Sequence, residues 1–255
     1  MHVSRPTRIA TTGLVLVLCA GALALGPVAS AETAGPPLPS SESTTPPEYV
    51  IAMRDAYAAK SFHEVQTILS KGWKSVNTEG ALVGGGTETD VITELGNRFS
   101  FTARLFNDRL YLNADQETLV TIGSLTPFNG GLNAGRWLVV PKSAAIYGEL
   151  AIGIDVRSGI DQIALAPPVT SGKITTFRGQ KVIPMTSNGG VHASSTEGLQ
   201  PGRFTLYVST GAHPLPVAEI VQDTIAKVAQ TVTLVFSQWN HPVSIVKPSH
   251  AVPLP

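Results

Sequence analysis

The chain has 255 residues, of which 43% are hydrophobic and 14% are charged. It carries 18 Lys and Arg against 18 Asp and Glu, so its formal net charge is zero. This balance gives no basic excess for nucleic acid and no acidic tail of the kind that stays disordered. The length and the apolar content are enough for one domain with a sizeable core.

The first 31 residues have the pattern of an export signal. His2, Arg5 and Arg8 form a charged start, and residues 14–25 are apolar. A membrane span needs about 20 apolar residues, so this run is too short for one. Ala29-Ser30-Ala31 supplies the small residues of a cleavage site. The sequence therefore predicts an exported protein, secreted or associated with the cell envelope.

Cys19 is the only cysteine, and it lies inside this predicted signal. It resembles a degraded acylation site of bacterial lipoproteins, in which Leu18 stands where a small residue is normal. Two outcomes stay open: cleavage after Ala31, or acylation of Cys19 and a membrane tether. Residues 32–47 are rich in Pro, Ser and Thr and predict a flexible spacer, either a tether or a disordered leftover.

A helix is predicted from the end of the spacer to about Lys60. The segment Thr45-Pro46-Pro47-Glu48 has the pattern of a capping box with prolines in the first turn. Val50, Met53 and Tyr57 recur at helical spacing and predict the buried face.

An antiparallel meander is predicted after this helix. The alternation is clearest over residues 98–105, where Phe99, Phe101, Ala103 and Leu105 face one way. Glycine and asparagine turns separate the strands. The predicted strands cover residues 62–70, 74–83, 87–95, 98–107 and 109–113.

The middle of the chain predicts an insertion made mostly of helices. Residues 115–123 predict a short helix or turn, 126–135 a loop, and 136–140 a short strand. Residues 143–154 and 156–165 predict two helices.

The C-terminal part returns to alternating patterns. Strands are predicted over residues 173–178, 181–186, 203–209, 215–220, 230–237 and 243–246, and residues 187–202 predict a polar loop that contains His192. The order of elements is typical of an α+β fold. So many strands favour a strongly curved antiparallel sheet with the middle helices on its concave side.

Four short patterns, in this order, carry a resemblance to a known family. They are Lys60-Ser61-Phe62 at the end of the first helix, Asn107 to Leu112, Gly135 to Val140, and Phe236 to Val243. In these the mature chain resembles actinobacterial lipoproteins of the LppX/LprG kind, and more remotely the lipoprotein carriers LolA and LolB. The resemblance implies a half-open β-barrel wrapped around helices, formed here by residues 48–255, with an apolar cavity that holds acyl chains.

Catalytic and metal-binding motifs are not found in the sequence. There is no Gly-x-Ser-x-Gly, His-Glu-x-x-His or phosphate-binding loop, and Gly84-Gly85-Gly86 predicts a hairpin turn. The histidines are scattered, and Asp108, Asp115, Asp155 and Asp161 are typical of solvated or capping groups. We therefore expect no enzyme activity and no cofactor.

The expected function is the binding or carriage of a lipid or other apolar ligand, with a membrane surface or an envelope protein as a further partner. Burial of a methylene is worth about 0.8 kcal/mol, so a sixteen-carbon chain gains roughly 12 kcal/mol on leaving water. An interaction or sensor module that uses the loops at 126–135 and 187–202 is the alternative. Whether the core is hollow or simply filled stays open at this point.

The residues expected to form the cavity wall share an apolar side chain on the sheet or on the middle helices. On the sheet they are Phe99, Phe101, Leu105, Phe204, Leu206, Val208, Val232, Leu234 and Phe236, and on the helices Ile146, Leu150, Ile160 and Ile163.

Overall fold

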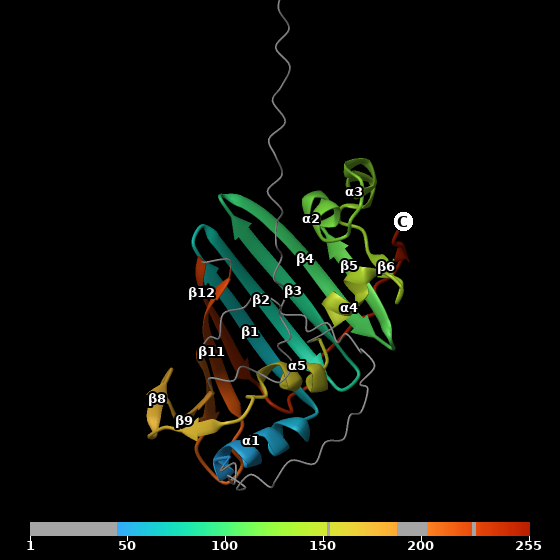
Figure 1. Ribbon diagram of the computed structural model, residues 1–255. Helices are drawn as coiled ribbons and strands as arrows, with labels where there is room; N and C mark the ends of the chain where they lie inside the picture. Colours follow the sequence, from blue (N-terminus) through green and yellow to red (C-terminus); the bar gives the residue numbers. More distant parts are fainter. Residues whose placement is uncertain (1–44, 152–153, 188–202, 226–227) are drawn as a thin grey trace, which may run out of the picture.

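The computed structural model describes residues 45–151, 154–187, 203–225 and 228–255 (Figure 1). The predicted export signal, Cys19, His192 and nearly all of the predicted spacer and of the 187–202 loop lie outside the described residues.

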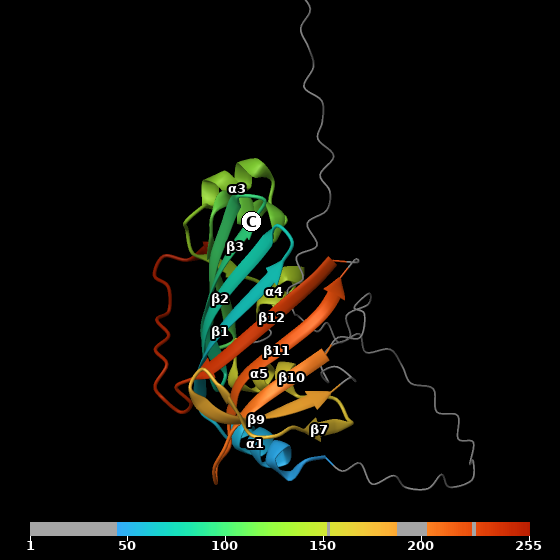
Figure 2. The same cartoon turned by 90° about the vertical axis from the view of Figure 1, so that its left-hand side faces the viewer.

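One large sheet dominates the described part of the chain. Its strands are β1 (Ser61–Ser70), β2 (Trp73–Leu82), β3 (Gly85–Glu94), β4 (Asn97–Phe106), β5 (Arg109–Ala114), β6 (Leu138–Val140), β7 (Val169–Ser171), β8 (Thr175–Phe177), β9 (Gln180–Ser187), β10 (Arg203–Ser209), β11 (Pro216–Ile225), β12 (Val228–Ser237) and β13 (Val252–Pro253). Their order is β13-β6-β5-β4-β3-β2-β1-β12-β11-β10-β9-β7, with β8 also paired to β9. The part from β3 to β7 can be followed in Figure 2. The pairs are antiparallel except β13 with β6. The predicted curved antiparallel sheet of an α+β fold is confirmed.

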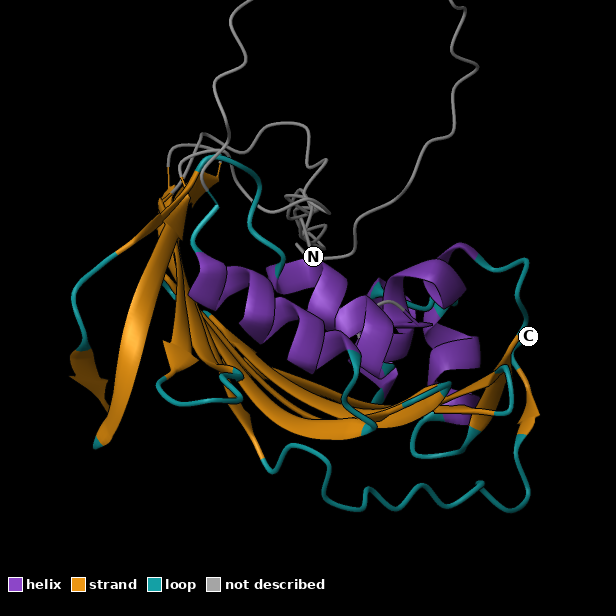
Figure 3. Cartoon of the chain, turned by 90° about the horizontal axis from the view of Figure 1, so that it is seen from below, coloured by secondary structure: helices purple, strands orange, loops and turns teal. Residues whose placement is uncertain are grey.

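Five helices of the described residues accompany the sheet. They are α1 (Pro47–Tyr57), α2 (Gln116–Thr121), α3 (Pro127–Asn133), α4 (Ala145–Ala151) and α5 (Val156–Ile163). Seen from below, the helices lie along the concave side of the curved sheet (Figure 3). The predicted middle helices are therefore confirmed, both as helices and in their position on the concave side of the sheet.

Alternation and turn chemistry explain the meander of β1 to β5. On β4, Phe99, Phe101, Ala103 and Leu105 are buried, and the residues between them are more exposed. The β4–β5 hairpin turns at Asn107 and Asp108, whose φ angles are 50° and 59°. Two positive φ values in a two-residue turn match the twist of the strands, and Asn and Asp tolerate them.

The start of α1 differs from the prediction. Pro46 is the N-cap and no side chain caps the helix, so the capping box is wrong. The buried face consists of Tyr49, Ala52, Met53 and Ala56. Val50 and Tyr57 are 53% and 44% exposed, and of the predicted face only Met53 is buried. The small Ala side chains let α1 lie close to its neighbours, which a count of large apolar residues does not detect.

Two further sequence predictions are wrong, and one strand was missed. The predicted loop at 126–135 contains helix α3, whose N-cap Thr126 accepts a hydrogen bond from the Asn129 amide at 3.2 Å. The predicted strand at 243–246 is not a strand, and the last strand is β13, which follows it. Strand β7 was not predicted, because its three residues are too few to show a period.

The residues that follow β12 form a strap across the convex face of the sheet. We call residues 238–251 the C-terminal strap, which is the long loop beneath the sheet in Figure 3. The Asn240 amide donates to the Ser61 carbonyl at 2.8 Å, and Arg104 Nη1 donates to the Val246 carbonyl at 2.9 Å. The strap thus runs from β1 past β4, and β13 then pairs with β6. It ties together strands that are far apart in the sheet order.

Gly86 marks the closest approach between the sheet and the helical side. A Cβ atom at this position would overlap the Ile154 carbonyl oxygen and would lie 2.8 Å from the Gly80 carbonyl oxygen. We expect Gly86→Ala to lower the free energy of unfolding by about 2 kcal/mol or more, because both obstacles are backbone. Gly148→Ala in α4 is the control, since no atom lies within 4 Å of its added Cβ. Urea denaturation measures both, and equal stability of the two variants would contradict this packing.

Candidate functional site on the concave face

All thirteen predicted wall residues are buried, and none is more than 9% exposed. The structure separates most of them into two clusters. The α1/α5 cluster contains Phe204, Leu206, Val208, Val232, Leu234, Phe236, Ile160 and Ile163. The α2/α4 cluster contains Phe101, Leu105, Ile146 and Leu150. Phe99 is buried on the same face of β4.

The end of the α1/α5 cluster is closed by aromatic rings. Phe62 makes an edge-on contact with Phe236 at a centroid distance of 5.6 Å, and Trp239 packs against both. Trp239 Nε1 donates to the Pro216 carbonyl at 2.9 Å. This arrangement partly buries the ring and satisfies its one polar atom. We therefore assign Trp239 a structural role.

A row of carboxyl groups lies between the two clusters. Glu64 on β1 is the register partner of Glu79 on β2, and Glu79 is the partner of Glu88 on β3. Neighbouring strands are about 4.8 Å apart, so the three Cα atoms span roughly 10 Å. Asp90 lies two residues beyond Glu88, on the same face of β3. We call these four residues and Glu219 of β11 the carboxyl row.

Every member of the carboxyl row is buried. Their exposed fractions are 7% for Glu64, 8% for Glu79, 6% for Glu88, 4% for Asp90 and 3% for Glu219. The row borders both clusters directly. On the side of the α2/α4 cluster, Glu88 is the register partner of Ala103, and Asp90 is the partner of Phe101. On the side of the α1/α5 cluster, Glu64 is the partner of Phe236, and Glu219 is the partner of Leu234. The concave face is therefore an apolar surface with an acidic centre.

Hydrogen bonds satisfy part of this row. Asp90 accepts a bond from the Ser75 hydroxyl at 2.7 Å, and Glu88 accepts one from the Asn77 amide group. Three buried oxygen atoms have no hydrogen-bond partner within the described part of the chain, namely Asn77 Oδ1, Glu79 Oε1 and Glu219 Oε1. Among the described residues, no ion pair joins the row to Lys, Arg or His.

Burial without a cation raises the pKa values of the row. It raises the pKa of Glu88 and of Glu219 to about 8, and the charges of neighbouring carboxylates add to the effect. Burial also raises the pKa of Glu64, and it raises that of Glu79 well above the ordinary value, with help from Glu64, Glu88 and Asp155. An ionised carboxylate in such surroundings is costly, so the proton stays on near neutral pH.

Tyr49 of α1 faces the row from the helical side. Burial raises the pKa of its hydroxyl to about 12, and the charge of Glu219 contributes to the rise. The hydroxyl donates to the Leu165 carbonyl at 3.3 Å. Tyr49 therefore stays protonated and is already engaged with the backbone.

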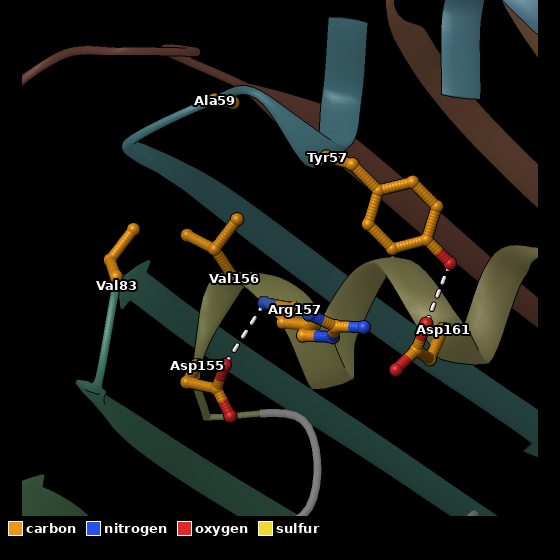
Figure 4. A pocket seen from close by; sticks show the side chains of 7 residues that line it. All are labelled: Tyr57, Ala59, Val83, Asp155, Val156, Arg157 and Asp161. Carbon is orange, nitrogen blue, oxygen red and sulfur yellow. Dashed lines mark hydrogen bonds between the residues drawn. The ribbon is translucent and has the colours of Figure 1, made fainter. Parts of the chain in front are cut away.

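A surface pocket lies between the end of α1 and the start of α5 (Figure 4). Its volume is about 460 Å³, and none of the predicted wall residues lines it. Asp155 caps α5 by accepting from the Arg157 amide at 2.9 Å, and Asp161 accepts from the Tyr57 hydroxyl at 2.6 Å. These carboxylates hold helices in place, as the sequence predicted for capping groups.

The two other aspartates also have structural partners or solvent. Asp115 accepts from the Thr118 amide at 2.8 Å and from the Ser100 amide at 2.6 Å, so it fixes α2 to β4. Asp108 is exposed and lies 3.8 Å from Lys142 Nζ. Within residues that the structure describes, no group of three or more His, Cys, Asp or Glu is placed to hold a metal ion.

Sequence reasoning missed the carboxyl row because some apolar residues of β1 face solvent while a glutamate of the same strand is buried. Val65 and Leu69 are 43% and 50% exposed on the convex face, and Glu64 is buried on the other face. The signal that reveals the row is the register of the hairpins. Glu64, Glu79 and Glu88 come into line only once both turns are fixed.

Comparisons with known proteins add little. No protein-family model matches the sequence, and no curated protein matches it significantly. Among solved structures, the chain is similar to an outer membrane lipoprotein-sorting protein domain from Vibrio parahaemolyticus, with 10% identity and a TM-score of 0.31, over 77% of this chain and 93% of that one. This TM-score is too low to support an argument, so the fold rests on the strand pairing itself. No helix in the described parts of the chain is long and apolar enough to span a membrane.

The raised pKa values predict how stability depends on pH. A carboxyl with a higher pKa in the folded protein holds its proton more tightly there than in the unfolded chain. The free energy of unfolding therefore falls as the pH rises from about 4.5 to about 8. We expect a loss of about 2 kcal/mol or more between pH 5 and pH 8, measured by urea denaturation.

Substitutions identify the groups responsible. Glu219→Gln keeps the shape and removes one titrating group, so it should flatten the profile. Glu117→Gln, on the exposed face of α2, should leave the profile unchanged. A wild-type stability that is constant or rises from pH 5 to pH 8 would contradict the buried, unpaired state of the row.

Proposed function

We propose that this protein is an exported, non-enzymatic cell-envelope protein that binds or carries a lipid or other apolar ligand between the curved sheet and its helices. The supporting observation is the concave face itself, where large apolar side chains of β4, β10 and β12 gather beneath short helices. The export pattern of residues 1–31 and the resemblance stated from sequence support the envelope location.

The helical side suits a binding face that opens. Helices α2, α4 and α5 have six, seven and eight residues, and each contributes only a few buried side chains. Helices this short are marginal alone and depend on tertiary contacts. A shift of one of them leaves the strand ladder intact, because its hydrogen bonds run between strands. An acyl chain that takes the place of helix contacts gains about 0.8 kcal/mol for each buried methylene.

Mass spectrometry of bound material tests this proposal. The mature protein is purified without detergent from an envelope fraction, and its organic extract is analysed. We expect an acyl lipid in near-stoichiometric amount. Ala103→Phe fills space on the concave face and should reduce the bound lipid, whereas Thr102→Phe on the opposite face of β4 should not.

If a variant does not fold, measurements on the wild-type protein alone test the proposal that it binds lipid. A well-folded protein whose extract holds no lipid, and which does not bind an uncharged fluorescent acyl probe, would contradict the proposal. The buried apolar residues would then be an ordinary filled core.

An interaction module is the second candidate, and α3 favours it. Phe128 and Leu132 are one helical turn apart and are 74% and 57% exposed. Exposed apolar side chains at this spacing form one face of a helix and suit a protein partner. Residues 126–135 were one of the two segments expected to serve this role.

A pull-down from envelope extract tests the second candidate. The double variant Phe128→Ser/Leu132→Ser should lose a partner that wild-type protein recovers, and its bound lipid should be unchanged. Undiminished recovery of every partner would rule out α3 as the docking surface.

A further inference from the structure

Three oxygens of the concave face have no partner within the described residues, and all three are hydrogen-bond acceptors once the carboxyl groups are ionised. They are Asn77 Oδ1, Glu79 Oε1 and Glu219 Oε1. Glu79 and Glu219 are more than nine-tenths buried, so bulk water does not readily serve them. A buried acceptor without a partner is costly, and such atoms are few in folded proteins. A group with several donors would satisfy all three oxygens and would favour the ionised form of the carboxyl groups.

The charges around the row indicate the sign of the missing group. The titratable side chains that face it are Glu64, Glu79, Glu88, Asp90 and Glu219 from the sheet, Tyr49 from α1 and Asp155 next to α5. Each of them is acidic or neutral. A cation that enters would stabilise the ionised carboxylates and satisfy the free oxygens at the same time.

The spacing favours an organic cation over a metal ion. The carboxyl groups of Glu64, Glu79 and Glu88 stand on successive strands about 4.8 Å apart, and Glu219 stands two strands beyond Glu64. A metal ion needs its ligands within about 2.6 Å of one point, and no such group of acidic, His or Cys side chains occurs in the described residues. An ammonium or guanidinium group donates several hydrogen bonds at longer reach.

Apolar surface borders the row on two sides. Phe101 and Ala103 of the α2/α4 cluster pair with Asp90 and Glu88. Phe236 of the α1/α5 cluster pairs with Glu64. A ligand held by its cationic group at the row would therefore place an attached chain against one of these clusters.

We propose that the carboxyl row binds the ammonium or guanidinium group of an amphiphilic ligand whose apolar chain lies on the flanking clusters. This inference rests on the proposed function and specifies the headgroup of its ligand. An acidic or neutral headgroup would leave the unpartnered oxygens without a charged donor, so the site selects against fatty acids as free carboxylates.

Two probes with the same alkyl chain separate the contribution of the headgroup to binding from that of the chain. Octylamine, which is an ammonium ion at pH 7.5, and octanol are titrated into the full mature chain by isothermal titration calorimetry. We expect octylamine to bind roughly tenfold tighter or more, as charge-assisted hydrogen bonds to buried carboxylates predict. In Glu79→Gln and in Glu219→Gln this ratio should fall towards one, with octanol affinity nearly unchanged.

Glu117→Gln on α2 is the matched control and should keep the wild-type ratio. The two row variants remove the charge but keep the shape, and thermal melts confirm that each is folded. Equal affinity of the wild type for both probes, or a ratio that survives in both row variants, would overturn the cationic site and leave the proposed function standing. Failure of both probes to bind would overturn the apolar binding function together with this inference.

Discussion

The constraint on which this structure depends most is the burial of five carboxyl groups that have no cationic partner in the residues the structure describes. The free-energy cost of moving an ionised carboxylate out of water is far larger than the gain from burying a methylene. The carboxyl groups of the row are therefore either neutral acids or paired with a positive group. Its position divides the interior into the α1/α5 and α2/α4 clusters. A core built for stability alone would place apolar side chains at Glu64, Glu79 and Glu88. We interpret the carboxyl row as a feature that lowers folding stability and serves ligand binding.

The rest of the fold holds this row in place. Strands β1 to β3 are ten residues long and are paired along nearly their whole length, which fixes the register of the three glutamates. On the convex face, the C-terminal strap contacts β1 and β4 and continues into β13 beside β6. It braces the sheet from outside and leaves the concave face to the short helices. A rigid wall opposite a layer of short helices is an arrangement that suits ligand entry.

The sequence predicted the strands well and the acidic centre not at all. The strands of the meander were placed within a few residues, because alternation and Asn107-Asp108-type turns are local signals. Helix α3 was missed because Gly130 and Gly131 favour a loop, and Gly130 packs closely against Val120. The capping box failed because Pro46, not Thr45, occupies the N-cap. The three glutamates of β1 to β3 come into line through the pairing of residues 15 and 9 positions apart, which composition and period do not report.

The most direct test of this account is a carbon-13 NMR titration of the glutamate side-chain carboxyl groups, with Glu88 and Glu219 assigned by Gln substitution. The account predicts that in the ligand-free protein these two groups titrate with pKa values of about 8. Titration of Glu88 and Glu219 near pH 4.5, the ordinary value for a glutamate, would contradict it, since the row would then be solvated or paired and would need no cation.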